Sequence, residues 1–169
     1  MTRKRRPTPH HDGAMSPDCI DPSGVEVREA RPDEAEQIAE LWLRARAASA
    51  PSIPEPVHDD EEVRTWFRAV VLPEQEVLVA VVSERLAGLL VLGEGSIEQL
   101  YVEPALTGRR IGTLIVDVAK ARFPGGLELW TFEANAGAWR FYERHGFAAL
   151  ERRSDHSEEG APDLRYRWR

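Results

Sequence analysis

Two glycines and two arginines lie close together in the middle of the chain, where Gly108, Arg109, Arg110 and Gly112 follow a short β-type run. Glycine lacks a Cβ, so a ligand can approach the backbone closely, and arginine supplies forked donors that suit phosphate oxygens. The next residues have the apolar spacing of a helix, whose first turn has N–H groups without partners inside the helix. This order over residues 97–120 indicates a phosphate site at the helix start; the alternative is a packing glycine beside two solvated arginines.

A second strand-to-helix stretch covers residues 127–147. Asn135 is a suitable N-cap residue, and Gly146 is a suitable stop. The helix between them has three residues on one face: Ala138, Phe141 and Tyr142. The chain therefore contains two strand–helix units with well-marked helix starts.

In these two stretches the chain resembles the GNAT superfamily of acyl-CoA-dependent N-acetyltransferases. That family has a strand ending in L-Y-V-x-P, a turn close to [QR]-x-x-G-x-[GA], and a later helix that reads N-x-x-A-x-x-F-Y-x-x-x-G-F. The sequence has L-Y-V-E-P at residues 100–104, and its later helix matches at every fixed position through Phe147. The turn departs from the pattern, with Thr107 at the Gln or Arg position and Arg110 at the middle glycine. We expect Arg110 to be helical already, because a side chain at positive φ is costly.

The resemblance implies acetyl-CoA as co-substrate and no metal. The pyrophosphate of acetyl-CoA would lie against the backbone of six consecutive residues: Gly108, Arg109, Arg110, Ile111, Gly112 and Thr113. Its pantetheine arm would hydrogen-bond like an added strand to Leu100 and Val102, and Asn135 would also bind it or simply cap its helix. Such binding requires the strands at 97–102 and 127–133 to splay apart.

A free amine is mostly protonated near pH 7, so a general base is useful for attack on the thioester. Glu98, on the strand before the phosphate site, is the first candidate, and its alternative role is a solvated strand carboxylate. Glu133 is the second candidate, and Glu103 is the third.

The resemblance also assigns Tyr142 as the group that protonates the departing thiolate; the alternative is a core tyrosine beside Phe141. A backbone N–H near Leu100 or Tyr101 would stabilise the developing oxyanion. We assign Phe141 and Phe147 to the core.

Composition limits the class of protein. The chain has 169 residues, of which 42% are hydrophobic, and a net charge of −7, which is enough for one domain with a real core. No apolar run approaches the roughly 18 residues that span a bilayer, and the acidic balance argues against nucleic acid as the main partner. The only cysteine, Cys19, excludes an intramolecular disulfide, and no Cys/His spacing indicates zinc. We expect a reduced, cytoplasmic protein.

Residues 1–24 are basic and rich in proline, so we expect a disordered tail followed by one acyltransferase domain over residues 25–169. The predicted elements alternate as β-α-α-β-β-β-α-β-α-β-β. This order gives an α/β fold with a mixed central sheet of about seven strands and about four helices. Three prolines make 50–56 an irregular loop. The acidic residues 59–62 begin the second helix, where negative charge is stabilising without any further role. The resemblance implies that the segment between the first two helices forms a wall of the acceptor site, and the alternative role of the acidic residues is to attract a cationic amine there.

The expected function is transfer of an acetyl group from acetyl-CoA to a primary amine by direct attack in a ternary complex. A catalytically inactive acyl-CoA-binding sensor or interaction module is the first alternative, and an adaptor that binds nucleic acid through the basic residues 3–6 is the second. A small molecule or a peptide could supply the amine, the acyl group could be longer than acetyl, and the protein could be a monomer or a homodimer.

Overall fold

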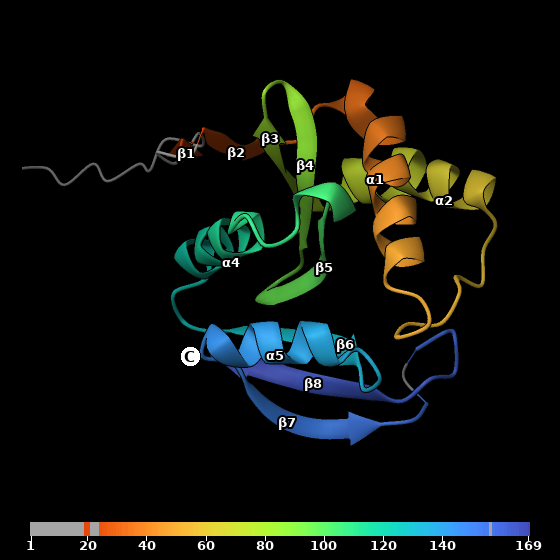
Figure 1. Cartoon of the computed structure of the whole chain (residues 1–169), viewed down its shortest axis with the longest axis vertical. Coiled ribbons are helices and arrows are strands. Elements are labelled where there is room, and N and C mark those ends of the chain that lie inside the picture. Colours follow the sequence, from red (N-terminus) through yellow and green to blue (C-terminus); the bar gives the residue numbers. More distant parts are fainter. Residues whose placement is uncertain (1–18, 21–23, 156) are drawn as a thin grey trace, which may run out of the picture.

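The computed structural model describes residues 19–20, 24–155 and 157–169. Most of the predicted tail, residues 1–18 and 21–23, lies outside the described residues. The described chain forms one sheet with helices on both faces (Figure 1). The predicted α/β class with a mixed sheet is confirmed.

The sheet has eight strands in the order β1-β2-β3-β4-β5-β6-β8-β7. Their bounds are β1 (Cys19–Ile20), β2 (Val25–Glu29), β3 (Glu76–Val82), β4 (Arg85–Leu92), β5 (Ser96–Val102), β6 (Leu127–Phe132), β7 (Ala148–Arg153) and β8 (Asp163–Trp168). Seven of them correspond to the predicted strands. The eighth is the two-residue β1, which pairs antiparallel with β2 through Cys19 and Val27.

The contact between β5 and β6 divides the sheet into two halves. These strands run parallel and are paired at only two places, Ser96 with Glu128 and Ile97 with Leu129. Beyond them β5 stays paired with β4 as far as Val102, while β6 stays paired with β8. The two strands therefore splay apart, which leaves one edge of β5 without a strand partner in the described part of the chain.

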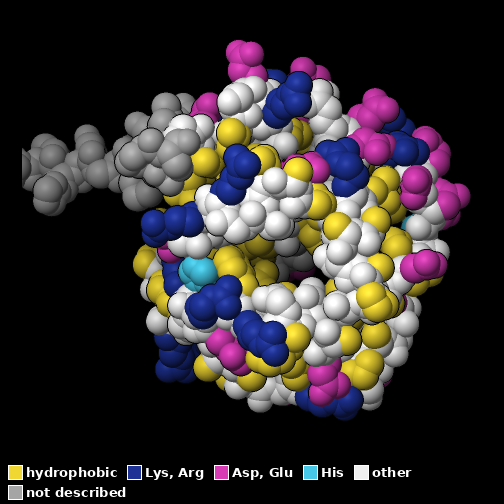
Figure 2. Space-filling view, viewed as in Figure 1, with side chains coloured by type: hydrophobic (Ala, Val, Ile, Leu, Met, Phe, Trp, Pro, Cys, Tyr) yellow, Lys and Arg dark blue, Asp and Glu magenta, His cyan; other side chains and the backbone are white. Residues whose placement is uncertain are grey.

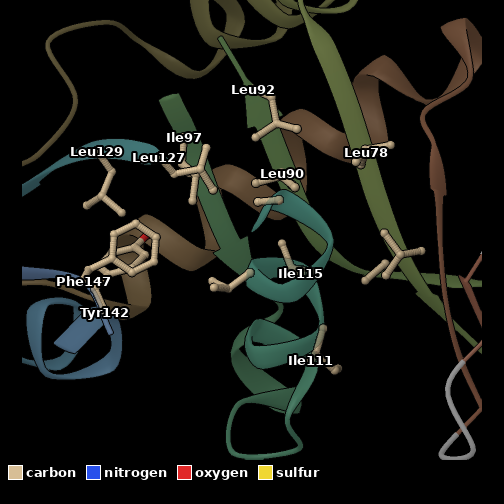
Figure 3. Close-up of a cluster of buried hydrophobic side chains, with 14 of the residues drawn as sticks. Leu78, Leu90, Leu92, Ile97, Ile111, Ile115, Leu127, Leu129, Tyr142 and Phe147 are labelled. Atoms are coloured by element: carbon tan, nitrogen blue, oxygen red, sulfur yellow. The ribbon is translucent and has the colours of Figure 1, made fainter. Parts of the chain in front are cut away.

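The helices cover the two faces of the sheet. The longer helices are α1 (Ala35–Ala48), α2 (Asp60–Trp66), α4 (Ile111–Arg122) and α5 (Ala136–Arg144). Helix α2 continues through the π-helical η2 (Phe67–Val71) into α3 (Leu72–Glu74). The two short 3₁₀ helices in the described residues are η1 (Pro32–Glu34) and η3 (Pro104–Leu106). α1 and η2 pack on one face with Val79 and Val91. α4 and α5 pack on the other, where Ile115 and Tyr142 join Leu90 (Figure 3).

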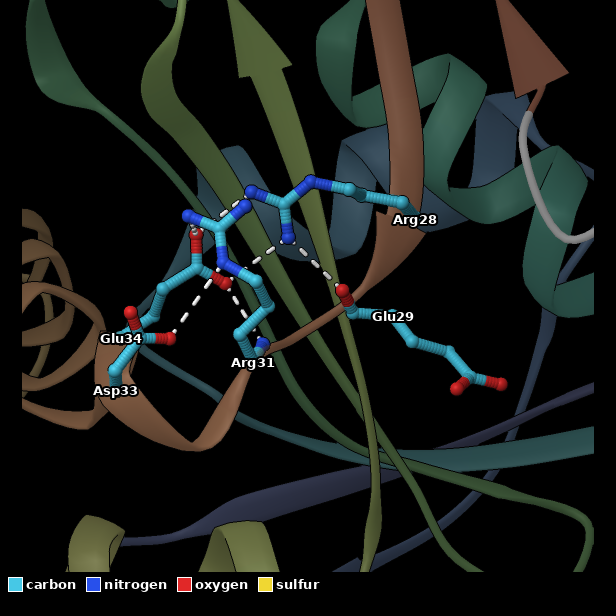
Figure 4. Close-up of polar contacts among 5 residues, drawn as sticks. All are labelled: Arg28, Glu29, Arg31, Asp33 and Glu34. Carbon is cyan, nitrogen blue, oxygen red and sulfur yellow. Dashed lines mark hydrogen bonds and ion pairs between the residues drawn. The ribbon is translucent and has the colours of Figure 1, made fainter.

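An ion-pair cluster fixes the start of α1. The Glu34 side chain is 3% exposed and accepts hydrogen bonds from Arg28 at 2.6 and 2.9 Å. It also accepts one from the backbone N–H of Arg31 at 2.8 Å (Figure 4). Because these bonds favour the charged form, the pKa of Glu34 is held below 4.5 against the opposing effect of burial. A strand and a helix start are thus joined by one buried carboxylate.

Candidate functional site

Glycines allow α4 to begin close to the open edge of β5. A Cβ on Gly88 of β4 would lie 2.5 Å from Ile115 of α4, so the helix packs directly on the strand backbone. A Cβ on Gly112 would lie 3.2 Å from the ring of Phe141, so α5 also approaches the first turn of α4. α4 therefore packs on β4, and its first turn is held against α5.

Arg110 differs from its expected conformation. It is the N-cap residue of α4 and has φ +65° and ψ 7°, so the prediction that it is already helical is wrong. The chain leaves η3 through Gly108, at φ +78°, and turns a second time in the left-handed region before the helix begins. The family pattern has glycine at this position because only glycine adopts it without strain, and Arg110 accepts that strain, of about 1 kcal/mol.

The first turn of α4 can hold an anion. The first intrahelical hydrogen bond runs from the N–H of Leu114 to the carbonyl of Arg110, at 3.0 Å. The amides of Ile111, Gly112 and Thr113 precede that bond and have no intrahelical partner. Gly108, Arg109 and Arg110 are exposed beside them. Free amides, an open backbone and two cations fit the pyrophosphate of a coenzyme A ester.

His145 was not predicted to belong to this region. Its Nε2 lies 3.1 Å from the hydroxyl of Thr113, and its Nδ1 lies 2.7 Å from the carbonyl of Phe141. The two rings of Phe141 and His145 are 4.3 Å apart. Phe141 therefore belongs partly to the core, as predicted, and partly to the contact between α5 and the start of α4.

A cavity of about 950 Å³ opens where β5 and β6 separate. Figure 2 shows the hollow in the centre of this face of the molecule. Residues from both halves line it, among them Ile97, Leu100 and Tyr101 of β5 and Trp130, Thr131 and Phe132 of β6. The residues between α1 and α2 also contribute, so the predicted acceptor wall and the open strand edge face one space.

Tyr142 lies at the α5 side of this cavity. Its residue is 7% exposed, and its ring packs edge to face on Phe141 and Phe147 at 5.3 and 5.5 Å. Burial raises its pKa well above 10, and the nearby Tyr101 adds to the effect. Among the described residues no side chain or carbonyl is hydrogen-bonded to its hydroxyl. Tyr142 is thus a protonated phenol with a free donor.

Glu98 also lines the cavity. Its side chain is exposed, and its carboxylate accepts a hydrogen bond from the hydroxyl of Ser96. A Cβ on Gly93 would lie 2.7 Å from the same carboxylate, which places it at the turn between β4 and β5. The residue that binds the Glu98 carboxylate, Ser96, does not line the cavity, so a substrate proton would reach Glu98 through a water molecule.

The other two glutamates are engaged elsewhere. Glu133 receives two hydrogen bonds of 2.9 Å from Arg152, which holds its pKa below 4.5. Glu103 is paired with Arg44 at 2.7 Å. Neither is among the residues that line the cavity. Their carboxylates are charged but already partnered.

Asn135 and two of the three strand residues line the cavity. Asn135 caps α5 by accepting a hydrogen bond from Ala138 N–H at 3.2 Å, and it also lines the cavity. Leu100, Tyr101 and Val102 pair with β4 through Leu90, Leu89 and Gly88, and Leu100 and Tyr101 line the cavity. The capping role of Asn135 is confirmed.

One residue that lines the cavity, Arg46, was missed by sequence analysis. Arg46 of α1 is 7% exposed and lies 4.8 Å from the centre of the Trp42 ring. Burial raises the pKa of Tyr101 beside it, and the guanidinium partly offsets that rise. A detectable signal was present, because Arg46 follows Trp42 by four residues on the apolar face of the helix.

Charge at the cavity mouth is mostly negative. Exposed Glu61 and Glu62 of α2 and Glu158 of the segment before β8 line it, with His58 between them. No group of three or more His, Cys, Asp or Glu residues able to hold a metal ion occurs in the described ranges. Nor does any helix there have the length and apolarity needed to cross a membrane.

Comparison with known proteins defines the class. The sequence profile of the acetyltransferase (GNAT) family matches residues 34–147. The chain therefore belongs to the GNAT family and is an acyltransferase, as the two motif stretches predicted.

Individual relatives agree with this assignment. Peptidyl-lysine N-acetyltransferase YjaB from Salmonella typhimurium is 28% identical over 140 residues, which cover 82% of this chain and 92% of that protein. The solution structure of apo-form YjaB from Escherichia coli is similar with a TM-score of 0.71 and 25% identity, covering 85% of this chain and 97% of that one. The structure of yncA from Salmonella typhimurium with its cofactor acetyl-CoA has the same fold, with a TM-score of 0.65, 19% identity, and coverage of 86% and 93%.

Proposed function

We propose that this protein transfers an acetyl group from acetyl-CoA to a primary amine, with both substrates bound together. The observation that carries the proposal is the two-pair contact between β5 and β6, which leaves a strand edge open inside a cavity next to the start of α4. An extended pantetheine amide chain can pair with that edge. Its thioester then lies between Glu98 and Tyr142, the two ionisable groups of the proposed reaction.

The proposed reaction needs no covalent enzyme intermediate. The amine nitrogen attacks the thioester carbonyl carbon, a backbone N–H of Leu100 or Tyr101 stabilises the oxyanion, and the carbon–sulfur bond then breaks. Glu98, through a water molecule, receives the proton lost by the nitrogen. Tyr142 gives its proton to the sulfur, and the high pKa that burial gives it keeps that proton in place beforehand.

The acceptor is a cationic amine in this proposal. The acidic groups at the cavity mouth raise the local concentration of cations. YjaB is named for action on peptidyl-lysine, so a lysine side chain of a peptide is one acceptor to test.

Thiol release from acetyl-CoA across a panel of amines tests the proposal. We expect release that depends on the amine and saturates with both substrates, with lines that intersect rather than run parallel in a two-substrate kinetic analysis. Calorimetry with coenzyme A provides the control for binding. Binding without turnover on any amine would instead support the acyl-CoA sensor, and parallel lines would indicate an acyl-enzyme.

A further inference from the structure

Arg46 is a buried cation at the acceptor end of the cavity. Its side chain is 8% exposed and extends from the last turns of α1. Arginine stays charged in proteins and has five N–H donors. Burying such a charge costs free energy unless it is paired and hydrogen-bonded.

The guanidinium bridges the two halves of the molecule. It lies over the rings of Trp42 in α1 and Phe132 in β6, at 4.8 and 5.8 Å. Its Nη2 donates to the carbonyl of Pro54 at 3.0 Å and to the carboxylate of Glu159 at 2.8 Å. The planar group is thus held on both sides and has little freedom to turn.

One buried donor of Arg46 has no partner among the described residues. Its Nε is buried, and no group in the described part of the chain accepts a hydrogen bond from it. Such an unmade hydrogen bond is destabilising, because the buried N–H has lost its contact with water. Glu159 meets the guanidinium through one oxygen and one nitrogen only, although arginine and a carboxylate can form two parallel bonds.

We propose that Arg46 binds the carboxylate of the acceptor, and that the acceptor is a small molecule with both an amine and a carboxylate, such as a free amino acid. The incoming carboxylate replaces Glu159 and bonds to both Nε and Nη2. Glu159 is 15% exposed and lies in the segment between β7 and β8, so it can leave without unfolding a strand. This inference rests on the proposed function.

The charges around the cavity favour this acceptor over simpler ones. A plain diamine suits Glu61, Glu62 and Glu158 at the mouth but meets the like charge of Arg46 inside. A plain anion suits Arg46 but is repelled at the mouth. A molecule with both charges satisfies the rim and the buried guanidinium, and a cavity of about 950 Å³ has room for it beside the thioester.

Matched acceptors test the proposal with the unaltered protein. Each free amino acid is compared with its decarboxylated amine and its methyl ester, for example lysine with cadaverine and with lysine methyl ester, by thiol release from acetyl-CoA. We expect kcat/KM at least tenfold higher for the best amino acid than for either of its counterparts. Equal or faster turnover of the amine, the ester or a lysine peptide with an amidated C-terminus would overturn the inference and leave the proposed function standing. No turnover with any amine would contradict both this inference and the proposed function.

Two substitutions separate recognition from simple support of the fold. Arg46→Lys keeps the charge but loses the fork, so KM for the amino acid should rise about tenfold while KM for acetyl-CoA stays within twofold. Glu159→Gln removes the competing carboxylate, so KM for the amino acid should fall several-fold. If the Arg46–Glu159 pair only held the two halves together, Glu159→Gln would instead lower activity with every acceptor, including amines without a carboxylate.

Discussion

The Tyr142 hydroxyl lies in a cavity wall made of apolar and aromatic side chains, with its ring held by Phe141 and Phe147. Desolvation raises its pKa above 10, so the phenol keeps its proton at neutral pH. A group of this kind can give a proton to a sulfur but cannot act as a base at neutral pH.

Tyr142→Phe should therefore lower kcat about a hundredfold or more, with KM for acetyl-CoA nearly unchanged, because the phenyl ring retains the packing. Steady-state kinetics measure both constants. Tyr166→Phe is the matched control, since Tyr166 is equally buried, donates to Glu143 at 3.1 Å and does not line the cavity. An equal loss in the two variants would mean that Tyr142 acts only through packing.

Glu98→Gln should lower kcat/KM about tenfold or more at pH 7, because the amine then loses its proton without help. The difference in kcat/KM between this variant and the original protein should become smaller as the pH rises toward the amine pKa near 10.4, where the free amine is abundant. A pH profile of the two proteins measures this. Glu94→Gln is the control, because Glu94 is exposed near the same turn and does not line the cavity; a constant deficit at all pH values would exclude Glu98 as the base.

At the scale of elements, the start of α4 depends on how closely α5 approaches it. Gly112→Ala would place a methyl group 3.2 Å from the Phe141 ring. We expect the cost of overpacking, about 1–3 kcal/mol, to exceed the gain of up to about 1 kcal/mol that alanine brings to a helix, so that the free energy of unfolding falls. Acetyl-CoA binding should also weaken because the first turn of α4 shifts.

Gly137→Ala is the matched control in the neighbouring helix α5, where the added Cβ meets no atom closer than 3.7 Å. It should raise the free energy of unfolding by up to about 1 kcal/mol, because alanine is the better helix former. Urea denaturation measures both variants, and a stabilised Gly112→Ala protein would contradict the packing argument.

The start of α1 makes the stability depend on pH. The folded pKa of Glu34 is lowered, so its contribution is complete above about pH 4.5 and is lost as the pH falls through the lower folded value. Glu34→Gln should cost about 1–3 kcal/mol at pH 7 and much less at pH 3. Asp33→Asn, at an exposed carboxylate with 80% of its side chain accessible, should change the free energy of unfolding little at either pH.

Local patterns predicted most elements but not the geometry between them. The apolar spacing of α1 and the N-cap of α5 depend on residues within one element, so the sequence was enough to find them. The left-handed Arg110 was missed because its φ depends on how the chain returns from η3 to α4. Arg46 was missed because a cation on an apolar face reads as an exposed residue until Phe132 and Glu159, far away in sequence, are seen to cover it.

On the scale of the whole molecule, the acyl donor, acetyl-CoA, should stabilise the arrangement of the two halves of the sheet. A ligand that bonds to β5, α4 and α5 binds only the folded protein, so coenzyme A at a hundred times its Kd should stabilise it by about 2.7 kcal/mol. Thermal unfolding with increasing coenzyme A measures the effect. Pantetheine should stabilise far less, because it lacks the phosphates that we propose are bound by Arg109, Arg110 and the free amides of α4; equal shifts would place the phosphate site elsewhere.

The unpaired edge of β5 faces inward across the cavity rather than outward into solvent. Exposed sheet edges invite strands of other molecules and so promote aggregation. Here a second polypeptide would have to thread between the halves to reach the edge, whereas a slender amide chain can enter. The free backbone N–H and C=O groups of this edge are therefore accessible to a small ligand, but not to a strand of another molecule.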